Sequence, residues 1–202
     1  MFDRWAGLSG LVLLFGMGVL WRCLHQLRRY GTIGFSLFSR DSWSVAPLLA
    51  LGLGVLAFAQ AILAAVAPDL VVPFVVPLGT LGAVMGVALT LAGTALMVIA
   101  QLSLGASWRI GIDPSARPGL VTGGTYRLSR NPIFLCMLIA MTGVSLLLPT
   151  PLSALLLIAS WVAVRHQVKE EERWLSQTYG DGYRAYAARV GRFLPWAGRL
   201  VS

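Results

Sequence analysis

The chain alternates between long uncharged stretches and short polar segments. No Lys, Arg, Asp or Glu occurs inside four intervals: Arg4 to Arg22, Asp41 to Asp69, Asp69 to Arg109, and Arg130 to Arg165. A helix needs ~20 predominantly apolar residues to cross the ~30 Å hydrocarbon layer of a membrane. Each interval is long enough to supply such a helix, so the pattern predicts an all-α polytopic membrane protein.

The apolar intervals predict five transmembrane helices, at about residues 5–24, 45–67, 78–104, 133–148 and 152–164. In the third, Gly82 and Gly86 form a GxxxG motif, which predicts close contact with a neighbouring helix. The last two stretches give only ~24 and ~20 Å of helix. We therefore expect the fifth helix to continue past Arg165 into water, because no helix breaker occurs before Gly180. A short basic, aromatic helix, ended by Gly191 and Pro195, should follow at the membrane interface.

A polar segment at residues 103–130 separates the third and fourth predicted helices. It carries the turn signals Asp113-Pro114 and Gly123-Gly124, and its aromatic and aliphatic residues argue against disorder. A loop of this length in a small protein is usually functional. It divides the sequence into residues 1–104, with three helices, and residues 105–202, with the loop, a helical hairpin and a tail.

The basic residues favour one orientation in the membrane. Every Lys and Arg except Arg4 lies in the first connection, the third connection or the tail, and the connections near Pro68–Pro77 and Pro149–Pro151 have none. Because basic loops face the cytoplasm, we expect the N-terminus outside and the C-terminus in the cytoplasm, as in a bacterial inner-membrane protein. The first apolar stretch is followed by WRCLHQLRR rather than a small-x-small cleavage site, so we interpret it as a retained helix and not a signal peptide.

Composition agrees with a membrane location. Only 12% of the residues are charged, whereas about a quarter is usual for a soluble domain. The net charge of +8 is explained by orientation and by contact with anionic lipid head groups. The expected partner is therefore the lipid bilayer, with no nucleic acid.

The motifs of soluble cofactor and metal enzymes are absent from the sequence. There is no GxGxxG after a strand, no P-loop, no HExxH and no defensible Ser-His-Asp set. Cys23 and Cys136 lack metal-ligand spacing, so we interpret both as small apolar residues. His166 follows Arg165 at the expected helix exit and is interpreted as an interfacial residue rather than a base. The sequence predicts no metal site.

The border between the polar loop and the fourth helix is unusually elaborate. Asn131 suits an N-cap and Pro132 suits the first helical turn, so local structure alone explains this pair. It does not explain the acidic run Glu170–Glu172 beside a basic surface. Two interpretations remain open: a solvated charge run, or an ion pair with Arg127 or Arg130 that encloses a polar pocket.

Two segments together resemble a known family. Residues 119–135, GLVTGGTYRLSRNPIFL, precede the apolar hairpin, and residues 170–195, EEERWLSQTYGDGYRAYAARVGRFLP, follow it. Their order and spacing resemble the membrane methyltransferases of the isoprenylcysteine carboxyl methyltransferase and phospholipid methyltransferase group. The resemblance covers about Leu120 to Pro195. It departs from the isoprenylcysteine enzymes where Arg130-Asn131-Pro132 replaces Arg-His-Pro.

The resemblance implies that S-adenosylmethionine binds at the cytoplasmic face. Its methyl group would pass to a membrane-resident or lipophilic acceptor that enters between helices from the bilayer, by O-, N- or S-methylation. The implied cofactor-binding residues are Leu120, Val121, Thr122, Gly124, Tyr126, Arg130, Asn131, Pro132, Phe134 and Glu171. The implied catalytic residues are Arg130, Glu171 and Glu172, and Tyr183 and Tyr186 are candidate substrate-binding residues.

The residue chemistry agrees with that implication. Methyl transfer is an in-line displacement at a sulfonium carbon, which needs alignment more than acid–base chemistry. Arg130 is suited to hold the methionine carboxylate, and Glu171 or Glu172 is suited to meet the amino group or the ribose hydroxyls. Tyr126 or Phe134 is suited to face the sulfonium.

Trp108-Arg109, in the polar loop, has two interpretations. The pair either anchors the loop at the membrane interface, or binds substrate through contact of Arg109 with an anionic acceptor.

Two other classes of membrane protein are alternatives to a methyltransferase. A non-catalytic transport or assembly subunit that retains the fold would place ionisable residues inside the membrane, whereas the predicted helices offer only Gln60 and Gln101. A membrane reductase that uses NADPH would need more basic residues for the 2′-phosphate. The bound cofactor separates the three classes.

Overall fold

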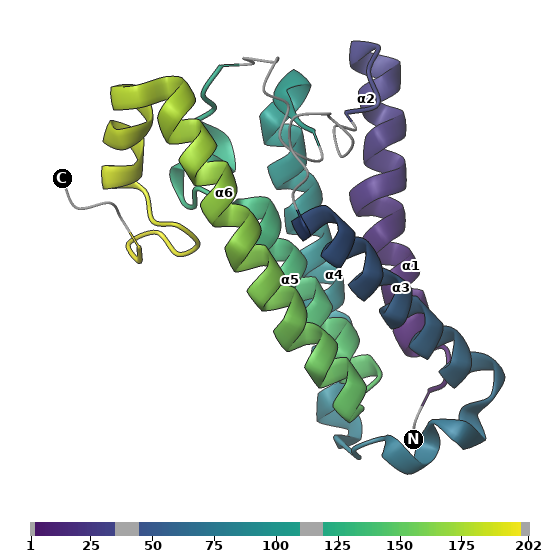
Figure 1. The fold of residues 1–202 in the computed structure, drawn as a ribbon. Helices are drawn as coiled ribbons and strands as arrows, with labels where there is room; N and C mark the ends of the chain where they lie inside the picture. Colours follow the sequence, from purple (N-terminus) through teal and green to yellow (C-terminus); the bar gives the residue numbers. More distant parts are fainter. Residues whose placement is uncertain (1–2, 35–44, 110–118, 199–202) are drawn as a thin grey trace.

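The structure of the protein is a computed structural model that describes residues 3–34, 45–109 and 119–198. Within these ranges every regular element is a helix or a short helical turn (Figure 1). In chain order they are α1 (Ala6–Phe15), η1 (Gly16–Trp21), α2 (Arg22–Tyr30), α3 (Val45–Val66), η2 (Pro68–Leu70), η3 (Val72–Phe74), α4 (Gly79–Leu104), η4 (Gly105–Ser107), η5 (Gly124–Arg127), α5 (Pro132–Leu147) and α6 (Pro151–Arg189). The predicted all-α architecture is confirmed.

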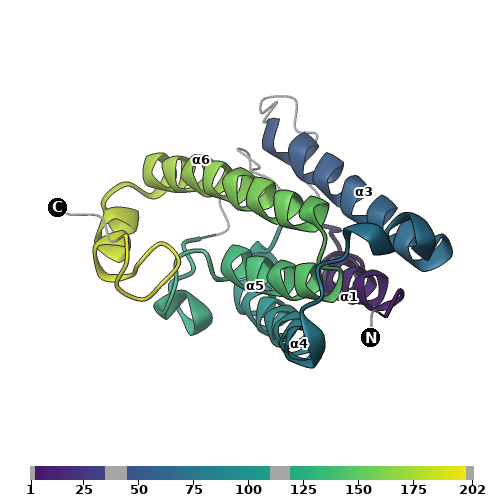
Figure 2. The same cartoon turned by 90° about the horizontal axis from the view of Figure 1, so that it is seen from below.

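Four helical rods are long and apolar enough to cross a membrane. They are Ala6–Tyr30, Leu48–Val66, Gly79–Ser107 and Pro151–Arg189. The remaining predicted span is α5, which has 16 residues and lies between α4 and α6 (Figure 2). At 1.5 Å per residue it is ~24 Å long, so it is a short fifth helix within the bundle.

Helix α6 continues well beyond the apolar part of its sequence. Thr150 caps its first turn by accepting a hydrogen bond from the Ser153 backbone N–H at 3.1 Å. Past Arg165 the helix carries the three glutamates out of the bundle, as the sequence predicted, and it bends at Gly180, whose φ is +51°. The helix ends at Arg189, two residues before Gly191, and residues 190–198 form a loop.

Glycines allow α4 and α5 to pack backbone to backbone. A Cβ atom on Gly143 would lie 2.4 Å from the Thr90 backbone nitrogen, and one on Gly93 would lie 2.5 Å from the Ala140 nitrogen. The predicted close contact of the GxxxG motif occurs at Gly86, which approaches the Gly143 carbonyl of α5. Tight packing of this kind is how helices associate in lipid, where apolar burial adds little.

The connections fall at two opposite ends of the bundle. The N-terminus, the η2–η3 segment and the α5–α6 turn lie at one end, whereas α2, η4, η5 and the final part of α6 lie at the other (Figure 1). The second end is the one that carries the basic connections of the sequence. All the candidate site residues of the polar loop and the tail therefore gather at one end.

Candidate active site

The glycine turn η5 is seated on the last turn of α4. Gly124 has φ +57°, a conformation that favours glycine. A Cβ atom there would lie 3.1 Å from the Ser103 hydroxyl oxygen. The turn then leads through Ser129, Arg130 and Asn131 into Pro132 at the first turn of α5, so these residues are presented at the end of the bundle.

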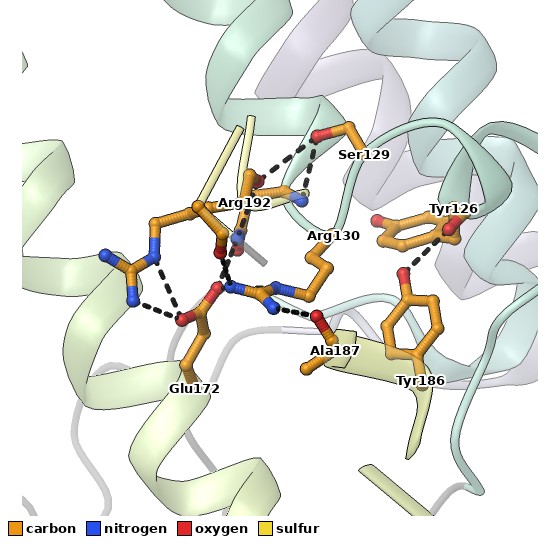
Figure 3. A network of polar contacts seen from close by, with 9 residues as sticks. Tyr126, Ser129, Arg130, Glu172, Tyr186, Ala187 and Arg192 are labelled. Carbon is orange, nitrogen blue, oxygen red and sulfur yellow. Dashed lines mark hydrogen bonds and ion pairs between the residues drawn. The ribbon is translucent and has the colours of Figure 1, made fainter. Parts of the chain in front are cut away.

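A buried carboxylate forms the centre of the site. Glu172 of α6 accepts hydrogen bonds at Oε1 from Arg130 Nε (3.0 Å) and Asn131 Nδ2 (3.1 Å), and at Oε2 from Arg192 Nε (3.0 Å) and Nη2 (2.8 Å) (Figure 3). We call these four residues the Glu172 clasp. Two guanidinium groups face one carboxylate, so the clasp carries one net positive charge. The ion-pair interpretation of the acidic run is confirmed for Arg130 and Glu172.

The same clasp fixes the tail of the chain. Arg130 also donates from Nη1 to the Ala187 carbonyl at 2.8 Å and from Nη2 to the Gly198 carbonyl at 3.0 Å. Its backbone N–H donates to the Gly191 carbonyl at 3.0 Å. Gly191 has no room for a side chain, because a Cβ atom would lie 1.8 Å from the Leu194 carbonyl oxygen. The tail therefore packs against the start of α5.

The three consecutive glutamates occupy three different environments. Glu170 pairs with exposed Arg173 at 2.7 Å on the helix surface. Glu171 is half-buried, and its hydrogen bond comes from Gln167 Nε2 at 2.9 Å. Burial raises the pKa of Glu171 to about 7, and the neighbouring charge of Glu172 adds to the effect. A cationic ligand beside this carboxyl group would lower its pKa again.

Tyrosines line the side of the site that faces η5. Tyr186 donates its hydroxyl to the Tyr126 carbonyl at 2.7 Å (Figure 3), and burial raises its pKa to about 12. Tyr183 is 1% exposed, and its hydroxyl has no hydrogen-bond partner among the described residues. The buried hydroxyls of Thr125 and Tyr179 are also without partners there. Burial raises the pKa of Tyr126 and Tyr183 as well, so the phenols of Tyr126, Tyr183 and Tyr186 are neutral.

The predicted site residues are brought together in part. Leu120 packs on the cluster of Tyr183 and Tyr186. Trp108 instead lies on the other side of α4, buried under the Arg22 guanidinium 4.5 Å from its ring centroid. The others keep positions along the polar loop and the start of α5: Val121 and Phe134 are half-buried, Thr122 and Gly124 are exposed, and Pro132 is buried.

The sequence reasoning missed Arg192 as a member of the clasp. The only local signal was a cation directly after Gly191 in the tail. Seven basic residues follow Val164 in the sequence, and nothing local distinguishes the one that reaches Glu172.

Comparisons with known proteins cover part of this site: the residues that match a family model include Arg130, Asn131 and Glu172, whereas Tyr183, Tyr186 and Arg192 follow them in the sequence. Residues 81–182 match the family model described as phospholipid methyltransferase. Protein-S-isoprenylcysteine O-methyltransferase A of Arabidopsis thaliana is 31% identical over 114 residues, which cover 55% of this chain and 58% of that protein. A probable protein-S-isoprenylcysteine O-methyltransferase of Oryza sativa subsp. indica is 30% identical over 115 residues, covering 55% and 60%. Protein-S-isoprenylcysteine O-methyltransferase B of Arabidopsis thaliana is 33% identical over 78 residues, covering 38% and 40%. The chain thus spans 60% or less of the length of these curated relatives.

Proposed function

Because the chain belongs to the phospholipid methyltransferase family, we propose that it transfers a methyl group from S-adenosylmethionine to a lipophilic acceptor in the membrane. The names of the similar plant proteins refer to O-methylation of isoprenylcysteine, an acceptor with a long apolar chain. An enzyme embedded in the bilayer can receive such an acceptor without exposing it to water. The substrate atom that receives the methyl group is oxygen, nitrogen or sulfur.

The observation that carries the proposal is a pair of opposite charges at one end of the bundle. The Glu172 clasp has one net positive charge, and Glu171, the adjacent residue, has a half-buried carboxylate that meets Gln167. The methionine part of the cofactor carries a carboxylate and an ammonium group. Charge-assisted hydrogen bonds to both ends would orient it.

Three buried hydroxyl groups without hydrogen-bond partners among the described residues support a cofactor site here. The hydroxyls of Thr125, Tyr179 and Tyr183 are buried without partners among the described residues, which costs about 1–3 kcal/mol for each group unless water or a ligand satisfies it. Ribose hydroxyls and an adenine ring offer both donors and acceptors. These side chains are therefore suited to the nucleoside part.

Glu171 and Glu172 take different roles in this proposal. Both oxygens of Glu172 are already used by the clasp, so Glu172 positions Arg130 and the tail. Glu171 is then the carboxylate that meets the cofactor's ammonium group. Arg130 holds the methionine carboxylate through guanidinium N–H groups that now face the Ala187 and Gly198 carbonyls.

The chemistry requires little beyond alignment. S-adenosylmethionine, held by Arg130 and Glu171, would supply an electrophilic methyl group that a lone pair of the acceptor displaces from sulfur. The aromatic ring of Tyr126 or Phe134 is suited to face the sulfonium. Burial at the membrane surface excludes water, which would compete as a methyl acceptor.

We also propose the placement of the chain in the membrane. The end that carries the site faces the cytoplasm, and the N-terminus lies outside, as expected for basic connections in a bacterial inner membrane. Residues 1–104 supply the supporting helices, and residues 105–202 supply the cofactor loop, the hairpin and the tail.

Calorimetric titration of the detergent-purified protein tests the proposal. We expect S-adenosylmethionine and S-adenosylhomocysteine to bind with micromolar affinity, NADPH not to bind, and Arg130→Ala to lose the binding. If neither sulfur compound binds to folded protein, the proposal is wrong, and a non-catalytic membrane subunit becomes the better interpretation.

A further inference from the structure

Arg22, the first residue of α2 within the first helical rod, is completely buried. It directly follows the π-helical turn η1 and reaches across to the end of α4. Its Nη2 donates to the Gly105 carbonyl at 3.0 Å and to the Gln101 carbonyl at 3.4 Å. The last carbonyls of a helix carry partial negative charge, so the end of α4 compensates the buried guanidinium.

The segment that leaves α4 is held by the first rod at successive residues. Gly105 is bound by Arg22, and the Ala106 carbonyl accepts from Gln26 Nε2 at 3.3 Å. Trp108 stacks under Arg22, and Gly34 also lies close to it, since a Cβ atom there would lie 2.9 Å from the indole ring. The chain therefore leaves α4 in one fixed direction.

The π-helical turn adds a third connection to α4. Gln101 Nε2 donates to the Gly18 carbonyl, which lies within that turn, at 2.8 Å. Single π turns inside α-helices occur frequently at functional sites. The π turn and the buried guanidinium of Arg22 are adjacent here, outside the region that matches the family model.

The last turn of α4 also supports the glycine turn of the candidate site. Ser103 lies between Gln101 and Gly105 in sequence, and a Cβ atom added to Gly124 of η5 would lie 3.1 Å from its hydroxyl oxygen. In Figure 1 the upper part of α4 separates α2 from η5. A contact that fixes this turn of α4 therefore also fixes η5. It fixes Tyr126 as well, because Tyr126 follows Gly124 by two residues in the same turn.

We propose that Arg22 is a positioning residue for the cofactor site, acting through the last turn of α4 on the glycine turn and Tyr126. This inference rests on the proposed function, because it assigns Arg22 to a cofactor site. Its hydrogen-exchange test does not depend on that function. Arg22 itself touches neither cofactor nor acceptor. It holds the surface against which the cofactor loop is built.

The test combines amide hydrogen exchange with cofactor binding, using the full chain in detergent. The variants are Arg22→Gln, which removes the charge and the stacking, and Arg22→Lys, which keeps the charge near the α4 carbonyls. Arg28→Gln, an exposed position on the same helix, is the matched control. Hydrogen exchange is read in peptides covering residues 105–109 and 123–127, with α5 as the internal reference.

We expect Arg22→Gln to accelerate exchange in both peptides while α5 stays protected, and to weaken binding of S-adenosylmethionine about tenfold. Arg22→Lys should recover part of both effects, and Arg28→Gln should match the wild type. Unchanged exchange at residues 123–127, or a uniform increase throughout the protein, would overturn the inference.

Two further outcomes are also decisive. If Arg22→Gln fails to fold, the same comparison is made with Arg22→Lys, whose ammonium cannot stack flat on Trp108 or bind two carbonyls as a planar fork. If the wild type binds no S-adenosylmethionine, the proposed function fails, and the exchange at residues 123–127 still decides whether Arg22 positions the glycine turn.

Discussion

At the scale of single residues, the acidic run shows how helix geometry assigns roles to neighbours. Successive side chains on a helix point about 100° apart, given 3.6 residues per turn. Glu170 therefore meets solvent and Arg173, while Glu172 points into the clasp and Glu171 lies between them. The run therefore combines a surface pair, Glu170 with Arg173, and a buried ion pair, Glu172 with Arg130.

The substitution Glu172→Gln should destabilise the protein strongly. It would leave the buried guanidinium of Arg130 without its counter-charge, and loss of one partner of a buried ion pair costs about 3–5 kcal/mol. We expect a clear fall in thermal stability, measured by unfolding in detergent. An unchanged melting temperature would show that the clasp contributes little to the fold.

Glu171→Gln should behave in the opposite way. The folded protein raises the pKa of this group from 4.5 to about 7, so the folded state favours the protonated form, and ionisation lowers stability as the pH rises through that window. The neutral amide removes this cost, and we expect equal or higher thermal stability at pH 8. The same variant should lose S-adenosylmethionine binding, which separates a ligand-binding role from a structural one.

The raised pKa of Glu171 also predicts how cofactor affinity depends on pH. Since the ammonium group of the cofactor needs the ionised carboxylate, affinity should rise about tenfold per pH unit up to pH 7 and then level off. Titrations between about pH 5.5 and pH 8 check this slope. A profile for Glu171→Gln that keeps the same slope would assign the titration to another group.

The sequence indicated the ion pair of Arg130 and the acidic run, because few residues there could pair. Arg130 and the acidic run were identified because opposite charges beside a membrane surface need partners. Arg192 and the stacking of Arg22 on Trp108 were missed, because these contacts join residues far apart in sequence without any local pattern.

At the scale of elements, the glycine turn is the feature most sensitive to small changes. Gly124→Ala must adopt a positive φ, at a cost of about 1–2 kcal/mol, and must displace the Ser103 side chain. We expect weaker cofactor binding. Gly123→Ala is the matched control, because Gly123 has φ −95° and open space around it. Equal effects of the two substitutions would mean that the turn plays no part in binding.

The interface of α4 and α5 offers a second test at this scale. Gly143→Ala places a methyl group against the α4 backbone at Thr90. Neither helix can move away without separating the pair, so we expect the free energy of unfolding to fall by at least about 1 kcal/mol. Gly52→Ala, in α3 with nothing within 4 Å, should change thermal stability little. The comparison is read from melting curves in the same detergent.

The helix boundaries were largely predictable from the sequence, because proline and glycine residues set several of them. Proline and glycine mark the start of α5, the start of α6 and the bend at Gly180. The π-helical turn had no sequence signal, and the Gly18 carbonyl within it accepts a hydrogen bond from Gln101, a residue far away in the sequence.

At the scale of the whole molecule, the positions of the connections allow a direct test of orientation. In a variant without Cys23 and Cys136, a single cysteine at exposed Asp69 should react with a membrane-impermeant maleimide on intact cells. A cysteine at exposed Asp181 should react only after the membrane is permeabilised. Labelling of Asp181→Cys on intact cells would reverse the proposed orientation.

The clasp has a consequence for biosynthesis. Arg130 emerges from the ribosome some forty residues before Glu172 and about sixty before the tail carbonyls that complete its hydrogen bonds. Helix α5 can enter the membrane long before that guanidinium has any of these partners. In a nascent chain the Arg130 guanidinium is therefore solvated by water and lipid head groups, and its full set of hydrogen bonds forms only after residues 187–198 have been translated.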